Sequence, residues 1–215
     1  MSLKSVESLA GEVARYAALA AFDVEPGARG SLVAWLSELV AWNARLDLTA
    51  AKTATELVEL MIGDALELAR VVPRDATVVD VGTGAGAPGL GLACVRPDLV
   101  ITLVEPLQKR CSFLRQAIGK TKCAKVTLLH GRLDVATDAM ARATFVFSRA
   151  TFAPNEWLAE AAAVVVPGAQ VAVLLAKEPV PSDSRMRLLG THAYGLAFSG
   201  RDRSIATFER TTTEA

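Results

Sequence analysis

The hydrophobic pattern of this chain changes near residue 72. Before that point apolar residues recur every three or four positions, which predicts amphipathic helices. Three such series cover residues 3–16, 32–42 and 57–68, and Pro26 with Gly27 interrupts the pattern between the first two. We expect Thr55 to cap the third helix and the tryptophans of the second to pack in the core.

After residue 72, short apolar runs alternate with helical segments, which is typical of a doubly wound parallel sheet. The expected strands are residues 77–81, 100–105, 126–130, 144–147 and 170–176. The expected helices between them are residues 90–95, 107–118, 135–140 and 155–166. Residues 188–198 and 204–210 predict a closing strand pair around Ser199-Gly200.

Together these runs predict an α/β fold with a mainly parallel, seven-stranded sheet and an N-terminal helical extension. We expect residues 1–72 to form a helical cap packed on the main domain, residues 73–215. Neither an internal repeat nor a low-complexity linker divides the chain further.

The first expected strand runs into a glycine-rich loop. The stretch reads Asp80-Val81-Gly82-Thr83-Gly84-Ala85-Gly86-Ala87-Pro88-Gly89. Glycines let the backbone turn at positive φ and let a ligand approach closely, and Pro88 suits the first turn of a following helix. The free N–H groups and positive dipole end of that helix favour an electron-rich ligand group. We therefore expect Gly82, Gly84 and Gly86 to bind a nucleotide-like cofactor.

Two cofactor classes use such a loop. Gly84-x-Gly86-x-x-Gly89 formally satisfies the dinucleotide fingerprint, which alone is weak evidence. The carboxylate of Asp80, inside the strand, would crowd a pyrophosphate but could face the amino acid end of S-adenosylmethionine. Glu105, at the tip of the next strand, is placed to bind ribose hydroxyls, which both cofactors carry. Asp80 therefore favours S-adenosylmethionine over NAD.

Composition narrows the class of protein. The 215 residues are 52% hydrophobic and 21% charged, which indicates a globular protein with a sizeable core. No apolar run is long enough to cross a bilayer and no signal pattern opens the chain, so we expect a cytoplasmic protein without membrane contact. Cys94, Cys111 and Cys123 form no Cys-x-x-Cys, so no disulfide framework or metal site is expected. The net charge of zero neither predicts nor excludes nucleic acid.

Several motifs together resemble the RsmG (GidB) family over residues 36–177. They are Trp42-Asn43, Leu48-Thr49, the glycine-rich loop, Arg96-Pro97, Lys109-Arg110, Phe113-Leu114 and Ser148-Arg149-Ala150. The resemblance implies a class I, Rossmann-like methyltransferase that transfers the methyl group of S-adenosylmethionine to guanine N7 of 16S ribosomal RNA, leaving S-adenosylhomocysteine. It also implies cofactor contacts at Gly82, Ala87, Leu133, Asp134 and Arg149.

The chain departs from this family in two places. The family usually carries Arg-His before Leu-Asp-Ser, where this chain reads Leu60-Met61 before Gly63-Asp64-Ala65. A glycine usual after the fifth strand is replaced by Glu178. Two alternatives therefore stay open: a divergent paralogue that methylates a small molecule or another RNA, and a nucleotide-binding module without catalysis.

The implied chemistry requires no general base. Guanine N7 has an in-plane lone pair and no proton, so it can attack the sulfonium methyl group directly once the reacting atoms are aligned. Arg149, after the fourth strand, is the expected catalytic residue and could hold guanine O6, a phosphate or the cofactor. His130 and His192 are expected to be structural.

Residues 109–125 are basic and contain no acid. Lys109, Arg110 and Arg115 could bind phosphates there, although a solvated helix face gives the same pattern. Phe152 could stack on the target guanine or pack in the core. The expected partner is 16S ribosomal RNA or the small ribosomal subunit, bound by a monomer.

Overall fold

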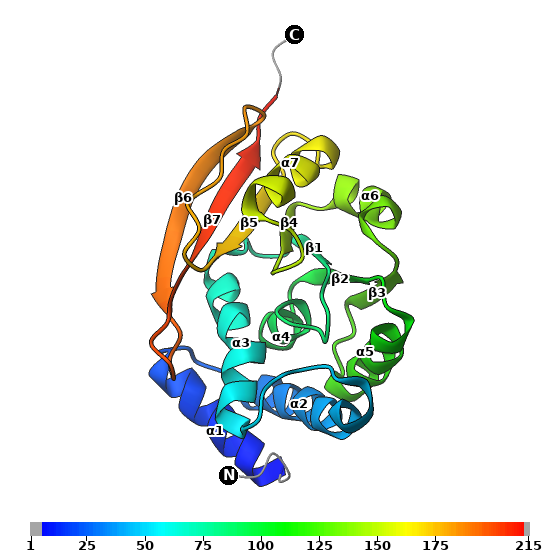
Figure 1. The fold of residues 1–215 in the computed structure, drawn as a ribbon, viewed down its shortest axis with the longest axis vertical. Helices are drawn as coiled ribbons and strands as arrows, with labels where there is room; N and C mark the ends of the chain where they lie inside the picture. The colour runs from blue at the N-terminus through cyan, green and yellow to red at the C-terminus, as the bar shows by residue number, and fades with distance from the viewer. Residues whose placement is uncertain (1–5, 213–215) are drawn as a thin grey trace.

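The computed structural model describes residues 6–212, which contain one sheet of seven strands. The strands are β1 (Thr77–Val81), β2 (Val100–Glu105), β3 (Val126–His130), β4 (Phe145–Ser148), β5 (Gln170–Leu175), β6 (Met186–Gly195) and β7 (Asp202–Arg210). Their order is β3-β2-β1-β4-β5-β7-β6, in which β1 to β5 run parallel and β7 is antiparallel to both β5 and β6 (Figure 1). The predicted doubly wound sheet is confirmed.

Four helices connect the parallel strands, as predicted. They are α4 (Gly89–Val95), α5 (Gln108–Thr121), α6 (Leu133–Arg142) and α7 (Pro154–Val164). β1, β2 and β3 begin and end at the predicted residues, because each is a short, mainly apolar run. The closing strands start two residues earlier than predicted, and Ser199 and Gly200 lie in the turn between them.

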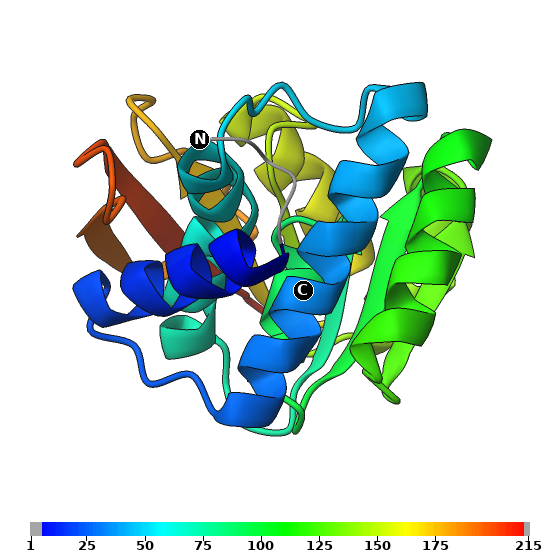
Figure 2. The ribbon, with the colours of Figure 1, turned by 90° about the horizontal axis from the view of Figure 1, so that it is seen from below.

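The two faces of the sheet are covered by different helices. Alternate residues of β1 point to opposite faces, so Val78 joins the core under α1 to α5, whereas Val79 joins the core under α6 and α7. On the first face, α2 lies beside α5 and α1 crosses α2, which Figure 2 shows from below. Asp80 shares this face with Val78.

The N-terminal helices are α1 (Val6–Leu19), α2 (Pro26–Leu46) and α3 (Ala54–Val71). The predicted break between the first two helices is present, at residues 20–25. It ends before Pro26 and Gly27, which form the first turn of α2, because proline's missing N–H is harmless there. The cap of α3 is Thr53, whose Oγ1 accepts from Glu56 N at 3.1 Å, and not Thr55. Leu3 lies outside the described residues.

These helices share one hydrophobic core with the sheet. Trp35 of α2 is fully buried, as predicted, and its Nε1 donates to the carbonyl oxygen of Ala85 in the glycine-rich loop at 3.0 Å. The helical cap therefore holds the loop directly, and the boundary at residue 72 stays a prediction. Within residues 6–212, no helix has both the length and the apolar character that a membrane span needs.

Candidate functional site

The glycine-rich loop lies where the strand order reverses, between the carboxyl ends of β2 and β4. The N–H groups of Gly82 and Thr83 donate to the carbonyl oxygen of Val104 at 2.9 and 3.0 Å. Gly82 has φ +78°, and a Cβ there would meet Oγ1 of Thr151, so this position requires glycine. Ligands of open parallel sheets bind at such a point.

Asp80 lies directly beneath this loop and is fully buried. Its Oδ2 accepts from Gly89 N, the first residue of α4, at 3.0 Å, whereas its Oδ1 is buried without a hydrogen bond partner among the described residues. Burial raises the pKa of Asp80 to about 6, against the opposing effects of the Thr83 hydroxyl, the Gly89 N–H and Arg149. One carboxylate oxygen is thus bound by Gly89, and the nearby Thr83 hydroxyl also favours the charged form.

Glu105 is also buried, at the tip of β2. Its Oε2 accepts from Gly84 N at 3.0 Å, and its Oε1 accepts from Leu107 N at 2.8 Å. The guanidinium of Arg110 lies 4.0 Å from Oε2. In this structure the Glu105 carboxylate therefore fixes the glycine-rich loop against β2.

Two cavities adjoin at the loop and share Gly82 and Thr151. The first encloses about 300 Å³ and is lined by Leu48, Thr49, Ala50, Leu60, Met61, Gly82, Thr83, Gly84, Ala85, Ala87, Arg110, Arg149, Ala150 and Thr151. The second encloses about 320 Å³ and is lined by Val81, Gly82, Val104, Pro106, Gly131, Arg132, Leu133, Asp134, Thr151 and Phe152. Among the described residues, neither lining includes Asp80, Glu105 or Gly86.

The structure brings most of the predicted cofactor residues to these cavities. Gly84, Ala87 and Arg149 line the first, and Leu133 and Asp134 at the start of α6 line the second. A Cβ added at Gly84, which has φ +62°, would meet no described atom within 4 Å, so the loop faces open space there. The carboxylates of Asp80 and Glu105 lie beneath the loop, where they bind the N–H groups of Gly89 and Gly84.

Arg149 is held from the far side by α3. Its Nη1 donates to the carbonyl oxygen of Leu60 at 2.8 Å and to Oδ2 of Asp64 at 3.0 Å. Asp64 is buried, and its Oδ1 accepts from the Tyr194 hydroxyl of β6 at 2.8 Å. Burial and the Asp64 charge raise the pKa of Tyr194, so the phenol stays protonated as a donor. Both contacts use one nitrogen of the guanidinium, at the wall of the first cavity.

Asp64 and Tyr194 were not predicted as functional residues. Asp64 lies in residues 61–69 of α3, which are all buried. A buried carboxylate requires a partner, so this position pointed to an interaction of Asp64. Nothing local marks Tyr194, because its contact with α3 joins residues 130 positions apart.

The predicted RNA-binding residues divide into two places. Arg110 lines the first cavity, whereas Lys109 and Arg115 are exposed on α5. Phe152 is half-buried, stacks on Trp157 with ring centroids 5.8 Å apart, and lines the second cavity. Phe152 and Arg149 therefore face different cavities.

His130 and His192 both contact the protein. Nε2 of His130 lies 3.1 Å from the carbonyl oxygen of Pro106, and Nε2 of His192 lies 2.8 Å from Oε2 of Glu67. Neither histidine lines the two cavities at the loop. Their geometry fits the predicted structural roles.

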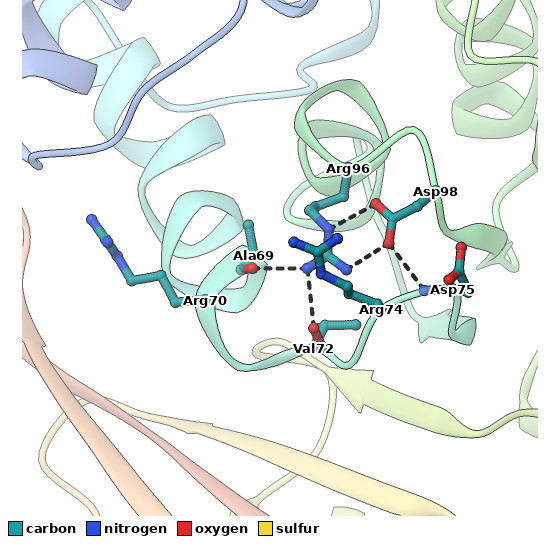
Figure 3. A pocket seen from close by; sticks show the side chains of 7 residues that line it. All are labelled: Ala69, Arg70, Val72, Arg74, Asp75, Arg96 and Asp98. Carbon is teal, nitrogen blue, oxygen red and sulfur yellow. Dashed lines mark hydrogen bonds and ion pairs between the residues drawn. The ribbon is translucent and has the colours of Figure 1, made fainter.

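A third cavity, of about 530 Å³, lies at the opposite edge of the sheet and carries Arg70, Arg74 and Arg96 (Figure 3). The Arg96 guanidinium is fully engaged: it donates to Asp98 and to the carbonyl oxygens of Ala69 and Val72. This cluster holds the end of α3 against the α4–β2 connection, which is a structural role. Arg96 also lowers the pKa of Asp98 well below its usual range.

Residues 29–181 match the GidB family, described as rRNA small subunit methyltransferase G. The chain belongs to this family. A GidB relative from Myxococcus xanthus, named ribosomal RNA small subunit methyltransferase G, is 34% identical over 184 residues, which cover 81% of this chain and 85% of the relative. A relative of the same name from Anaeromyxobacter dehalogenans is 31% identical over 196 residues, covering 87% and 91%.

Membership of the GidB family confirms the predicted resemblance and makes the protein a methyltransferase. The fold agrees. The structure of a predicted O-methyltransferase from Agrobacterium tumefaciens superposes with a TM-score of 0.54 at 19% identity, covering 69% of this chain and 81% of the other. Within residues 6–212, no three His, Cys, Asp or Glu side chains gather into a metal-binding group.

Proposed function

We propose that this GidB enzyme transfers the methyl group of S-adenosylmethionine to guanine N7 of 16S ribosomal RNA. The observation that carries the proposal is the pair of adjoining cavities at the glycine-rich loop, in a chain whose family is described as an rRNA methyltransferase. The named activity of the Myxococcus xanthus relative supports the same acceptor.

The residues at the loop fit the cofactor. The orphaned Oδ1 of Asp80 is a buried acceptor near the loop, and its negative charge favours the cofactor's ammonium group. Leu133 and the Asp134 carboxylate would contact the adenine in the more apolar second cavity. Phe152, on the wall of that cavity, is better placed for this adenine than for the target guanine. The Glu105 carboxylate is buried, so it would meet the ribose only if the loop above it moved aside.

The cofactor supplies an electrophilic methyl group on a sulfonium sulfur. The protein's task is then alignment, because guanine N7 needs no deprotonation and well-oriented reactants gain several kcal/mol of barrier reduction. Arg149 is the residue that would align the guanine with the methyl group. Held through Nη1 by α3, its guanidinium can donate from its other nitrogens to guanine O6 or to a phosphate.

One feature of the first cavity favours a second candidate function, in which the methyl group goes to a different acceptor. Leu60 and Met61 line it where the family usually carries Arg-His, so its wall offers no cation from α3 at these positions. A GidB enzyme with this wall could accept another RNA or a small molecule.

The deciding experiment uses methyl-labelled S-adenosylmethionine and small ribosomal subunits lacking the modification. We expect label in 16S RNA and chain cleavage by aniline after borohydride reduction, which identifies 7-methylguanine. Fully modified subunits are the matched control and should take up no label. Cofactor binding without labelled RNA would reject ribosomal RNA as the acceptor, whereas label at another atom would reject N7.

A further inference from the structure

Two of the three cysteines meet at the edge of the sheet opposite the glycine-rich loop. Cys94 lies in the last turn of α4, and Cys123 lies in the connection between α5 and β3. Their sulfur atoms are 3.7 Å apart, although the residues are 29 positions apart in the sequence. Cys94 is buried and Cys123 is half-buried, so the pair has one accessible and one protected thiol.

A cavity of about 470 Å³ lies beside the cysteine pair. Both cysteines line it, together with Lys122 and Lys125 of the same connection and Glu25 from the start of α2. Its lining is mostly apolar, and its lysines outnumber its carboxylates. A small molecule that carries negative charge beside its reactive group suits this cavity.

The two thiols are chemically unequal. The hydrogen bond between the two sulfur atoms lowers the pKa of Cys123 to about 7, against the effect of burial. The same hydrogen bond and burial raise the pKa of Cys94 well above its usual value. Near neutral pH a substantial fraction of Cys123 is thus thiolate, the nucleophilic form, while Cys94 keeps its proton.

We propose that Cys123 and Cys94 form a thiol–disulfide exchange site for anionic low-molecular-weight disulfides, such as oxidised glutathione. The Cys123 thiolate attacks one sulfur of the incoming disulfide, which forms a mixed disulfide and releases one thiolate. Cys94 then gives its proton to water and attacks the Cys123 sulfur, displacing the second thiolate. The two cysteines are oxidised to one disulfide, and the incoming disulfide is reduced to two thiols.

Closing the internal disulfide requires the sulfurs to approach from 3.7 Å to about 2.0 Å. We expect Cys123 to move, because it lies in the short connection 122–125 between α5 and β3. This connection is more exposed than α4, which holds Cys94. The bond would join α4 to this connection, away from both cavities at the loop. The site is therefore separate from the methyl-transfer site.

The test treats the reduced, full-length protein with excess oxidised glutathione and maps its disulfides by mass spectrometry. We expect the loss of two hydrogen atoms, one linked peptide pair containing Cys94 and Cys123, and full reversal by dithiothreitol. Cys111 is the internal control: it is buried, donates to the Glu105 carbonyl oxygen at 3.2 Å, and should stay reduced.

Two variants separate the steps. Cys94→Ser should trap a stable glutathione adduct on Cys123, whereas Cys123→Ser should slow loss of the first thiol by at least about tenfold, because the remaining thiol is buried. A wild-type protein that keeps the adduct on Cys123 without closing, reacts first at Cys111, or does not react would overturn the proposal. These three outcomes are measured on the wild-type protein, so misfolding of a variant cannot hide them.

The charge preference has its own measurement. Oxidised glutathione should react faster with the wild-type protein than cystamine, a cationic disulfide. Lys122→Glu should reduce that ratio, while Arg142→Glu, at the end of α6, should not. Equal rates for the two disulfides in the wild-type protein would reject the anionic ligand class.

Discussion

At the scale of single residues, the buried carboxylate of Asp80 has the strongest effect on the proposed site. Its pKa of about 6 means that the protein without cofactor holds a costly charge at neutral pH. One oxygen is committed to Gly89 N and the other has no partner among the described residues. A cationic ligand group nearby would relieve this cost, so binding and ionisation should be coupled.

Cofactor affinity should therefore depend on pH. Affinity for S-adenosylhomocysteine, measured by calorimetry, should rise as pH increases through about 6 and then level off, because only ionised Asp80 attracts the ammonium group. Asp80→Asn should bind more weakly above pH 6 and lose this pH dependence. An unchanged affinity in the variant would remove Asp80 from cofactor binding.

The same residue predicts an effect on stability without cofactor. Because the folded-state pKa is raised from 3.8 to about 6, the protonated form is the favoured one, and stability is lost as pH rises between these values. Above pH 6 the free energy of unfolding of Asp80→Asn, measured with urea, should therefore exceed that of the wild type by up to about 3 kcal/mol. Near pH 3.8 the two proteins should be equally stable. Weakening of the hydrogen bond from Gly89 N would make the stability difference smaller. A stability difference that does not change with pH would contradict the prediction.

At the scale of elements, the glycine-rich loop is fixed by a helix far from it in sequence. The indole N–H of Trp35 in α2 reaches the Ala85 carbonyl oxygen, and the loop in turn is tied to β2 through Glu105. The sequence predicted Trp35 as a core residue, and this is confirmed. Its hydrogen bond was beyond prediction, because it depends on how α2 docks on the sheet.

Trp35→Phe should lower cofactor affinity, since it frees the Ala85 carbonyl oxygen and loosens the loop. A matched control is available. The indole N–H of Trp157 in α7 donates to the Ala172 carbonyl oxygen at 2.9 Å in the other core, so Trp157→Phe makes the same chemical change away from the loop. Both should lose about 1–3 kcal/mol of stability by denaturant unfolding, and only Trp35→Phe should weaken S-adenosylhomocysteine binding several-fold. Equal effects on binding would reject this role.

The β6–β7 hairpin and α3 meet at a second element-scale contact. Tyr194→Phe removes the hydroxyl that holds Asp64, which in turn holds Arg149. We expect methyl transfer to fall several-fold, because Arg149 loses the support that fixes its guanidinium at the first cavity. His192→Asn is the control: His192 lies two residues away on β6 and stacks on the Tyr194 ring, but its hydrogen bond is to Glu67 and not to Asp64. A similar loss of activity in the control would indicate general damage to the hairpin.

At the scale of the whole molecule, the sequence predicts features that are contiguous in the chain and misses those that the fold brings together from distant segments. The run from Asp80 to Gly89 is contiguous, so its residues and their place at the carboxyl edge were readable from the sequence. Arg149, Asp64 and Tyr194 come from the end of β4, from α3 and from β6, and no spacing encodes their meeting. For the same reason the sequence did not reveal that Phe152 and Arg149, three residues apart, line different cavities.

The path of the RNA would depend on cations spread over the surface of the molecule. Arg110 lines the first cavity, and the exposed Lys109 and Arg115 continue from it along α5. If these cations bind phosphates, each contact releases counterions and makes binding salt-dependent. The double variant Lys109→Ala with Arg115→Ala should weaken binding to 16S RNA and reduce the slope of log affinity against log salt by up to about 2. Arg142→Ala, an exposed cation on α6, should leave the slope unchanged, and an unchanged slope in the double variant would place the RNA elsewhere.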